Sequence, residues 1–172
     1  IHPFHTATHL LATGDDVGGV RVWDERIRSG SAPVPKSSSK KGLPQGCVLS
    51  WKENEDYISD MELAQDGNTL LATSADGRLA VFDLRMARDP SQQQNKSGQK
   101  PIRLSDDQED ELLSLKIIKH GKKVVCGTQN GVLSVFSWGV WGDCSDRFPG
   151  HPLSVETLLK VDEDTLLTGS SD

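Results

Sequence analysis

The chain has 172 residues, of which 35% are hydrophobic and 26% charged, and its formal net charge is −6 at pH 7. This balance is ordinary for a globular protein, whereas an extended nucleic-acid surface would need clustered cations. The longest apolar runs fall far short of the roughly 20 residues of a membrane-spanning helix, and 16 glycines, many at expected turns, favour an all-β class.

One pattern recurs along the chain: an apolar strand, a polar turn with a glycine, and an alternating strand. It occupies 10–24, 70–83 and 124–136, and its first half returns at 165–172. In each complete copy an aromatic residue follows the turn glycine by five positions, and these pairs are Gly18 with Trp23, Gly77 with Phe82, and Gly131 with Phe136. A fixed internal period predicts a repeat fold in which each copy contributes one blade of four strands.

The copies divide the chain into four predicted blades and two polar insertions. The blades are approximately 1–28, 48–86, 102–138 and 145–172, and the insertions are approximately 29–46 and 87–100. Both insertions are polar and lack a hydrophobic period, so we expect surface loops. They account for the wide spacing of the first copies relative to a repeat of roughly 40–45 residues.

These residues resemble the WD-repeat β-propeller family. The resemblance rests on Val20–Asp24 (VRVWD), its variant Val81–Asp83 (VFD), and the Gly150-His151 dipeptide before a strand. It implies an all-β fold, a partial WD-repeat β-propeller with about three and a half four-stranded blades of a seven-bladed ring. We therefore expect residues 1–172 to be a fragment of one propeller domain.

In that family a His, a Ser or Thr, a turn Asp and a Trp form a hydrogen-bonded set that satisfies buried polar groups. The structural positions that carry the resemblance here are Trp23, Asp24, Phe82, Asp83, Asp76 and His151. The set is incomplete, because Phe82 lacks the indole donor and Asn54 stands near the His position of the second copy. We expect some blades to be held mainly by apolar packing.

Two strands end in an Asp that is followed two residues later by an Arg. The pairs are Asp24 with Arg26 and Asp83 with Arg85. A guanidinium at a blade edge can present a planar fork to a carboxylate or carbonyl of a partner. Such endings resemble the signature of substrate receptors for the cullin-4 ubiquitin ligase adaptor. The alternative is that both Arg side chains are solvated or pair within their own blade.

Trp138 and Trp141 form a second candidate for partner binding. Glycines flank them after a strand, and exposed Trp side chains often dominate the binding energy of interfaces. The alternative is that both rings pack over a blade edge. Two charged segments also have two interpretations: the acidic run 106–111 is a solvated loop or attracts a basic ribosomal or histone-like protein, and the basic segment 36–41 is a solvated loop or a weak nuclear-localisation or RNA-contacting patch.

The sequence contains no pattern typical of an enzyme. We find no nucleophile elbow, phosphate loop, zinc pair or supported carboxylate dyad. His2, His5 and His9 lack a fourth ligand on a shared face, so a metal site is not expected. We therefore predict no catalytic residue, no metal, no cofactor and no small-molecule substrate.

Four further segments resemble a nucleolar branch of the WD-repeat family, above all its plant and algal forms. They are 55–61, 127–131, 137–139 and 143–148. This resemblance implies a non-enzymatic scaffold of the nucleus and nucleolus, with a cytoplasmic pool also expected. Such a scaffold would support rRNA production and ribosome biogenesis through assembly factors, with indirect RNA association and no membrane. The alternative is a substrate receptor of a cullin-4 RING ubiquitin ligase that uses Arg26 and Arg85.

Overall fold

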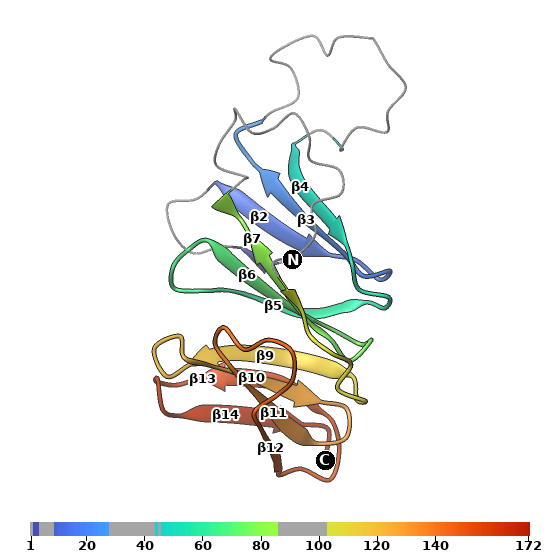
Figure 1. The fold of residues 1–172 in the computed structure, drawn as a ribbon, viewed down its shortest axis with the longest axis vertical. Coiled ribbons are helices and arrows are strands. Elements are labelled where there is room, and N and C mark those ends of the chain that lie inside the picture. The colour runs from blue at the N-terminus through green and yellow to red at the C-terminus, as the bar shows by residue number, and fades with distance from the viewer. Residues whose placement is uncertain (1, 4–8, 28–43, 45, 86–102) are drawn as a thin grey trace.

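The computed structural model describes residues 2–3, 9–27, 44, 46–85 and 103–172. Their antiparallel strands form three four-stranded sheets and one two-stranded sheet. We call these sheets blades 1 to 4 in chain order, and Figure 1 shows them stacked along the long axis from blade 1 at the top. Apart from Pro44 and Gly46, the predicted insertions 29–46 and 87–100 lie outside the described residues.

The strands of each blade follow one another in chain order. Blade 1 contains β1 (His2–Pro3), β2 (Leu10–Gly14), β3 (Gly19–Asp24) and β4 (Cys47–Lys52). Blade 2 contains β5 (Ile58–Leu63), β6 (Thr69–Ser74), β7 (Leu79–Asp83) and β8 (Arg103–Leu104). Blade 3 contains β9 (Leu112–Ile118), β10 (Lys123–Thr128), β11 (Val132–Ser137) and β12 (Asp146–Pro149). Blade 4 contains β13 (Val155–Lys160) and β14 (Leu166–Ser170). The all-β prediction is confirmed.

The sheets divide the chain differently from the predicted blade ranges. β4 falls in the predicted range 48–86, yet it pairs with β3, where Val22 lies opposite Leu49. β8 falls in the range 102–138, yet it pairs with β7. β12 falls in the range 145–172, yet it pairs with β11. In all three cases the fourth strand pairs with the third strand of the preceding repeat, because that strand still has a free edge. Each repeat in the sequence is therefore offset from its blade by one strand.

Apolar side chains on both faces of each sheet hold the blades together. Successive residues of a strand point to opposite faces, and Leu70 packs towards blade 1 while Leu71 packs towards blade 3. The same alternation in blade 3 sends Val124 to blade 2 and Val125 to blade 4. Burial on both faces explains why β6 and β10 are apolar runs rather than polar–apolar alternations.

Three turn glycines lie where one blade meets the next. A Cβ atom on Gly18 would lie 2.1 Å from the Asn54 carbonyl oxygen, and one on Gly131 would lie 2.1 Å from that of His151. A Cβ atom on Gly77 would lie 2.7 Å from Asp107 Oδ1 and 3.0 Å from the Asp110 carbonyl oxygen, in the loop before β9. A side chain at these positions would separate neighbouring blades, so the glycine spacing seen in the sequence reflects blade stacking.

No helix among the described residues is long and apolar enough to cross a membrane.

Candidate functional site

The hydrogen-bonded set predicted for WD repeats is present in part of blade 1. The indole Nε1 of Trp23 donates to Thr13 Oγ1 at 2.9 Å. In the strand register, Thr13 lies opposite Arg21, two residues before the Trp. This hydrogen bond satisfies the indole N–H inside a half-buried site, which would otherwise be costly to desolvate.

Blades 2 and 3 replace both members of this pair. The register places Ala72 opposite Ala80, two residues before Phe82, and Cys126 opposite Ser134, two residues before Phe136. Ala72 and Cys126 are fully buried and both Phe rings are at most 1% exposed. The indole and the hydroxyl are therefore lost together, so neither is left without a partner. Phe82 instead packs on Trp51 of β4, with ring centroids 4.7 Å apart.

The position at which the WD-repeat pattern has a His is occupied by a different residue in each of blades 2, 3 and 4. In blade 4, His151 Nε2 lies 2.8 Å from Thr168 Oγ1 and Nδ1 lies 3.7 Å from an Asp172 oxygen. In blade 2, Asn54 Nδ2 donates to Asp76 Oδ1 at 3.2 Å, so both residues lie where the resemblance predicts. Asn54 Oδ1 is buried without a partner among the described residues, because Ala72 supplies no hydroxyl where blade 4 has Thr168.

The sequence reasoning missed the corresponding residue of blade 3, which is Gln108. Its backbone N–H donates to the Gly77 carbonyl at 3.0 Å, as that of His151 donates to Gly131 at 3.1 Å. Gln108 is 3% exposed, and its amide nitrogen donates to the Asp106 carbonyl at 2.9 Å. The spacing contained the signal, since Gln108 precedes Asn130 by 22 positions, as Asn54 precedes Asp76.

Arg26 and Arg85 form equivalent pairs at the ends of β3 and β7. Arg26 donates through Nε and Nη2 to the two oxygens of Asp24, at 2.9 and 2.7 Å. Arg85 donates to Asp83 in the same way, and these hydrogen bonds hold the pKa values of both Asp carboxyls below their usual range. The Arg side chains remain 64% and 71% exposed. The structure thus shows intra-blade pairing, and their role in partner binding stays a prediction.

Trp138 and Trp141 pack against each other edge to face, with centroids 4.9 Å apart. Trp141 is 7% exposed and belongs to the core between blades 2 and 3, and the half-buried Trp138 packs on that core. The burial of Trp141 supports the second interpretation, in which this ring packs over a blade edge. The loop from β11 to β12 folds back, and the Gly142 carbonyl accepts the Asp106 N–H at 2.7 Å. Binding by Trp138 stays a prediction.

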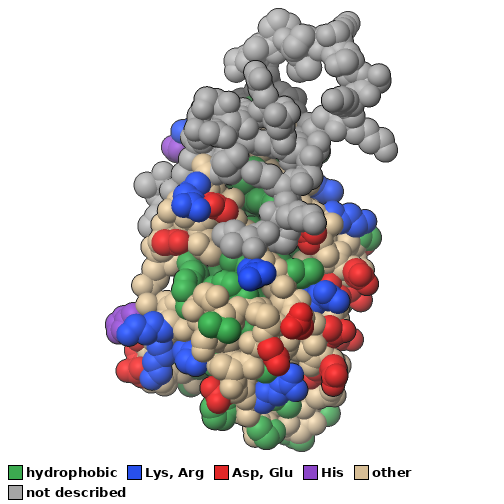
Figure 2. All heavy atoms as spheres, in the orientation of Figure 1, with side chains coloured by type: hydrophobic (Ala, Val, Ile, Leu, Met, Phe, Trp, Pro, Cys, Tyr) green, Lys and Arg blue, Asp and Glu red, His purple; other side chains and the backbone are tan. Residues whose placement is uncertain are grey.

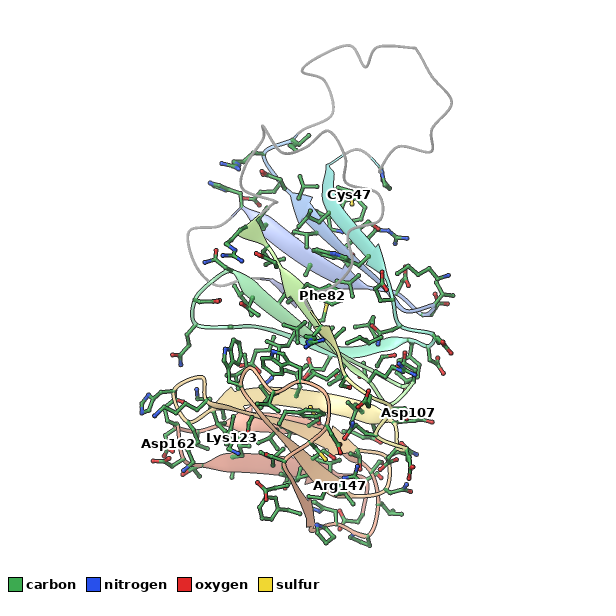
Figure 3. All side chains as sticks on the ribbon, in the orientation of Figure 1. Cys47, Phe82, Asp107, Lys123, Arg147 and Asp162 are labelled. Carbon is green, nitrogen blue, oxygen red and sulfur yellow. The ribbon has the colours of Figure 1, made fainter. Side chains whose placement is uncertain are left out.

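A hollow of about 460 Å³ lies between the turns of blades 2 and 3. We call it the acidic hollow, because five of its nine lining residues are carboxylates: Asp76, Asp107, Glu109, Asp110 and Glu111, beside Ala75, Gly77, Gln129 and Asn130. In Figure 2 Asp and Glu side chains are frequent along the right side of the molecule, the side on which Figure 3 labels Asp107. Asp162, in the turn from β13 to β14, lies on the opposite side (Figure 3).

Within the part of the chain that the structure describes, no three His, Cys, Asp or Glu side chains are arranged to hold a metal ion. The candidate His5 lies outside those residues. The polar side chains singled out above are engaged in turns and blade junctions.

Comparisons with known proteins agree with this architecture. The family model described as "WD domain, G-beta repeat" matches residues 45–83, which run from β4 through β7, the offset unit identified above. A chain from a crystal structure of the mitotic checkpoint complex superposes with a TM-score of 0.68 at 13% identity, over 94% of this chain and 42% of that one. The chain therefore contains a WD repeat and folds as part of a β-propeller.

Within that class it is similar to WD repeat-containing protein 55. The Arabidopsis thaliana protein of that name is 44% identical over 92% of this chain, and the Bos taurus protein is 34% identical over 95%. WD repeat-containing protein JIP5 of Coprinopsis cinerea is 42% identical over 95%. The chain spans 35–37% of the length of these relatives, none of which carries an enzyme name.

Proposed function

We propose that this chain is part of a non-enzymatic protein-interaction scaffold that supports rRNA production and ribosome biogenesis in the nucleolus. The fold supports the scaffold role, because WD-repeat blades present connecting loops on a stack held by three apolar cores. The similarity to WD repeat-containing protein 55 supports the choice of process.

The charge of the loops that meet between blades 2 and 3 indicates what kind of partner the scaffold binds. Five carboxylates line the acidic hollow, with no Lys or Arg among its lining residues. Complementary charge mainly raises association rate and selects partners. Proteins that assemble on rRNA are rich in Lys and Arg, because they neutralise phosphates. We therefore propose that basic segments of ribosome assembly factors or ribosomal proteins contact this side.

Affinity capture of the tagged protein from nucleolar extract tests this proposal. The informative variant combines Glu109→Gln with Glu111→Gln, two carboxylates whose side chains are not needed for a described hydrogen bond. The control variant combines Glu25→Gln with Asp164→Asn, which removes the same charge from exposed surface pairs that contribute little to stability. We expect ribosome assembly factors to be enriched by wild type and control and reduced in the first variant. No enrichment over an unrelated propeller, or equal capture by all three proteins, contradicts the proposal.

A second candidate function is that of substrate receptor for a cullin-4 ubiquitin ligase. The observation in its favour is the pair of exposed Arg forks, Arg26 and Arg85, each held in a fixed direction by its own Asp. Replacing both by Ala should abolish binding to the purified ligase adaptor, whereas Arg78→Ala on the opposite turn should not. Unchanged binding of the double variant would exclude this function.

A further inference from the structure

Asn130 and Gly131 form the tip of the hairpin between β10 and β11, at the rim of the acidic hollow. Asn130 is exposed. Its backbone N–H donates to Asp110 at 3.2 Å, but its side-chain amide has no partner among the described residues. The Gly131 N–H makes only a long hydrogen bond of 3.3 Å to the Thr128 carbonyl.

The same turn position is anchored in blade 2. There Asp76 accepts Asn54 Nδ2 at 3.2 Å and the Glu55 N–H at 2.7 Å. In blade 3 the counterpart of Asn54 is Gln108, which turns away to bond the Asp106 carbonyl and the Cys144 N–H, at 2.9 and 3.4 Å. Because Gln108 is engaged elsewhere, nothing described holds the Asn130 amide away from the following peptide nitrogen.

We propose that Asn130-Gly131 is a site of spontaneous deamidation. Asn is chemically labile, and a following glycine places no side chain beside the reacting nitrogen. The Gly131 nitrogen attacks Cγ of Asn130, its proton passes to solvent, and the Cγ–Nδ2 bond breaks with release of ammonia. Water then opens the cyclic imide. Cleavage at Cγ gives Asp, and cleavage at the main-chain carbonyl gives isoaspartate, without any oxidation or reduction.

The two products have different consequences for the fold. Asp is isosteric with Asn and already stands at this turn position in Asp76 and Asp172, so it adds one carboxylate to the hollow and leaves the turn unchanged. Isoaspartate lengthens the main chain by one methylene just before Gly131. The Gly131 carbonyl accepts the Gly150 and His151 N–H groups at 3.3 and 3.1 Å, and its Cα has no free space towards His151. Isoaspartate therefore loosens the junction of blades 3 and 4.

Peptide mapping of the purified protein after incubation in mildly alkaline, ¹⁸O-labelled water tests the proposal. The tryptic peptide 124–147 contains Asn130 as its sole Asn, whereas peptide 53–78 contains Asn54 and Asn68 and serves as an internal control. We expect peptide 124–147 to gain three daltons, one from deamidation and two from the isotope, about tenfold faster than the control peptide. Equal rates in the two peptides, or a gain without isotope, would overturn the proposal.

The variant Asn130→Asp separates the two products. It should unfold at the same temperature as fresh wild type and should show no further gain in mass at this peptide. Aged wild type that an isoaspartyl methyltransferase labels at this peptide should unfold at a lower temperature than the variant. If the labelled material is as stable as Asn130→Asp, the consequence drawn for the blade junction is wrong.

Discussion

The Thr13–Trp23 hydrogen bond of blade 1 has no counterpart at the equivalent positions of blades 2 and 3. Both partners change together, to Ala72 with Phe82 and to Cys126 with Phe136. Losing one partner alone leaves a half-buried polar group unsatisfied, whereas an apolar pair needs no partner. The residues at these positions should therefore be coupled energetically.

A double-mutant cycle measures this coupling. Trp23→Phe and Thr13→Val should each lower the free energy of unfolding, and the double variant should lose less than their sum by about 1 kcal/mol. Denaturant titration of the four proteins gives the value. Additive losses would show that the hydrogen bond adds nothing beyond packing.

Glu62 makes the stability of the fold depend on pH, in a direction that follows from the shift of its pKa. It lies on β5, accepts the Ile117 N–H at 3.2 Å and lies 3.4 Å from Lys116 Nζ. Burial raises its pKa although Lys116 opposes the shift. A carboxyl with a raised folded-state pKa stabilises the fold fully below its unfolded pKa, and this contribution is lost as pH rises through the folded pKa.

Glu62→Gln removes the charge and keeps an acceptor for Ile117. We expect its free energy of unfolding, relative to wild type, to increase as pH rises from the acid side of the ordinary Glu pKa to neutrality. Urea titrations across that range test the sign, with Glu111→Gln as the control for an exposed carboxylate. A relative stability that falls with rising pH would mean that the ion pair with Lys116 outweighs burial.

At the scale of elements, the blade junctions depend on turns without side chains. Gly131 has a φ of 80° and lies against the chain that leads into β13. Gly139, in the loop after β11, has a φ of 85° with no atom near a hypothetical Cβ. Substitutions at the two glycines therefore distinguish the cost of backbone strain from the cost of steric clash.

Gly131→Ala should cost on the order of 3 kcal/mol of unfolding free energy, because strain and clash add. Gly139→Ala should cost only about 1 kcal/mol, from strain alone. Thermal or denaturant unfolding of both variants gives the comparison. Equal losses would show that the blades can separate without a penalty.

The loop from β11 to β12 is another element that joins two blades. Trp141→Ala should cost about 3–5 kcal/mol, because it opens a cavity between blades 2 and 3. Trp138→Ala should cost clearly less, since this ring is partly solvated. A loss for Trp141→Ala below that of Trp138→Ala, in the same denaturant titration, would contradict the packing described here.

Periodicity was enough to predict the strands on either side of each turn glycine, because apolar runs, turn glycines and aromatic residues recur at fixed spacing. It gave no indication of the short strands β1, β8 and β12. It did not assign β4, β8 and β12 to their sheets, since a fourth strand that follows a loop has no local signal for its partner. It also left Trp141 ambiguous, because burial depends on a loop folding onto the preceding blade. Gln108 was missed because the family pattern has a His there, although the spacing to Asn130 matched.

For the whole molecule, the stack of blades separates two kinds of surface. The buried apolar side chains lie in the cores between blades, whereas the charged candidates for partner contact lie in the loops at the two ends of the strands. At one end the carboxylates of the acidic hollow gather, and Arg26 and Arg85 extend from the other ends of their strands.

Titration of a Lys- and Arg-rich peptide against the purified protein tests this central claim most directly. Fluorescence anisotropy at two salt concentrations should show binding that weakens with salt. The Glu109→Gln, Glu111→Gln variant should raise Kd about three- to tenfold, and the Glu25→Gln, Asp164→Asn control should leave it unchanged. The same Kd for wild type and both variants, at either salt concentration, would contradict the assignment of this side to basic partners.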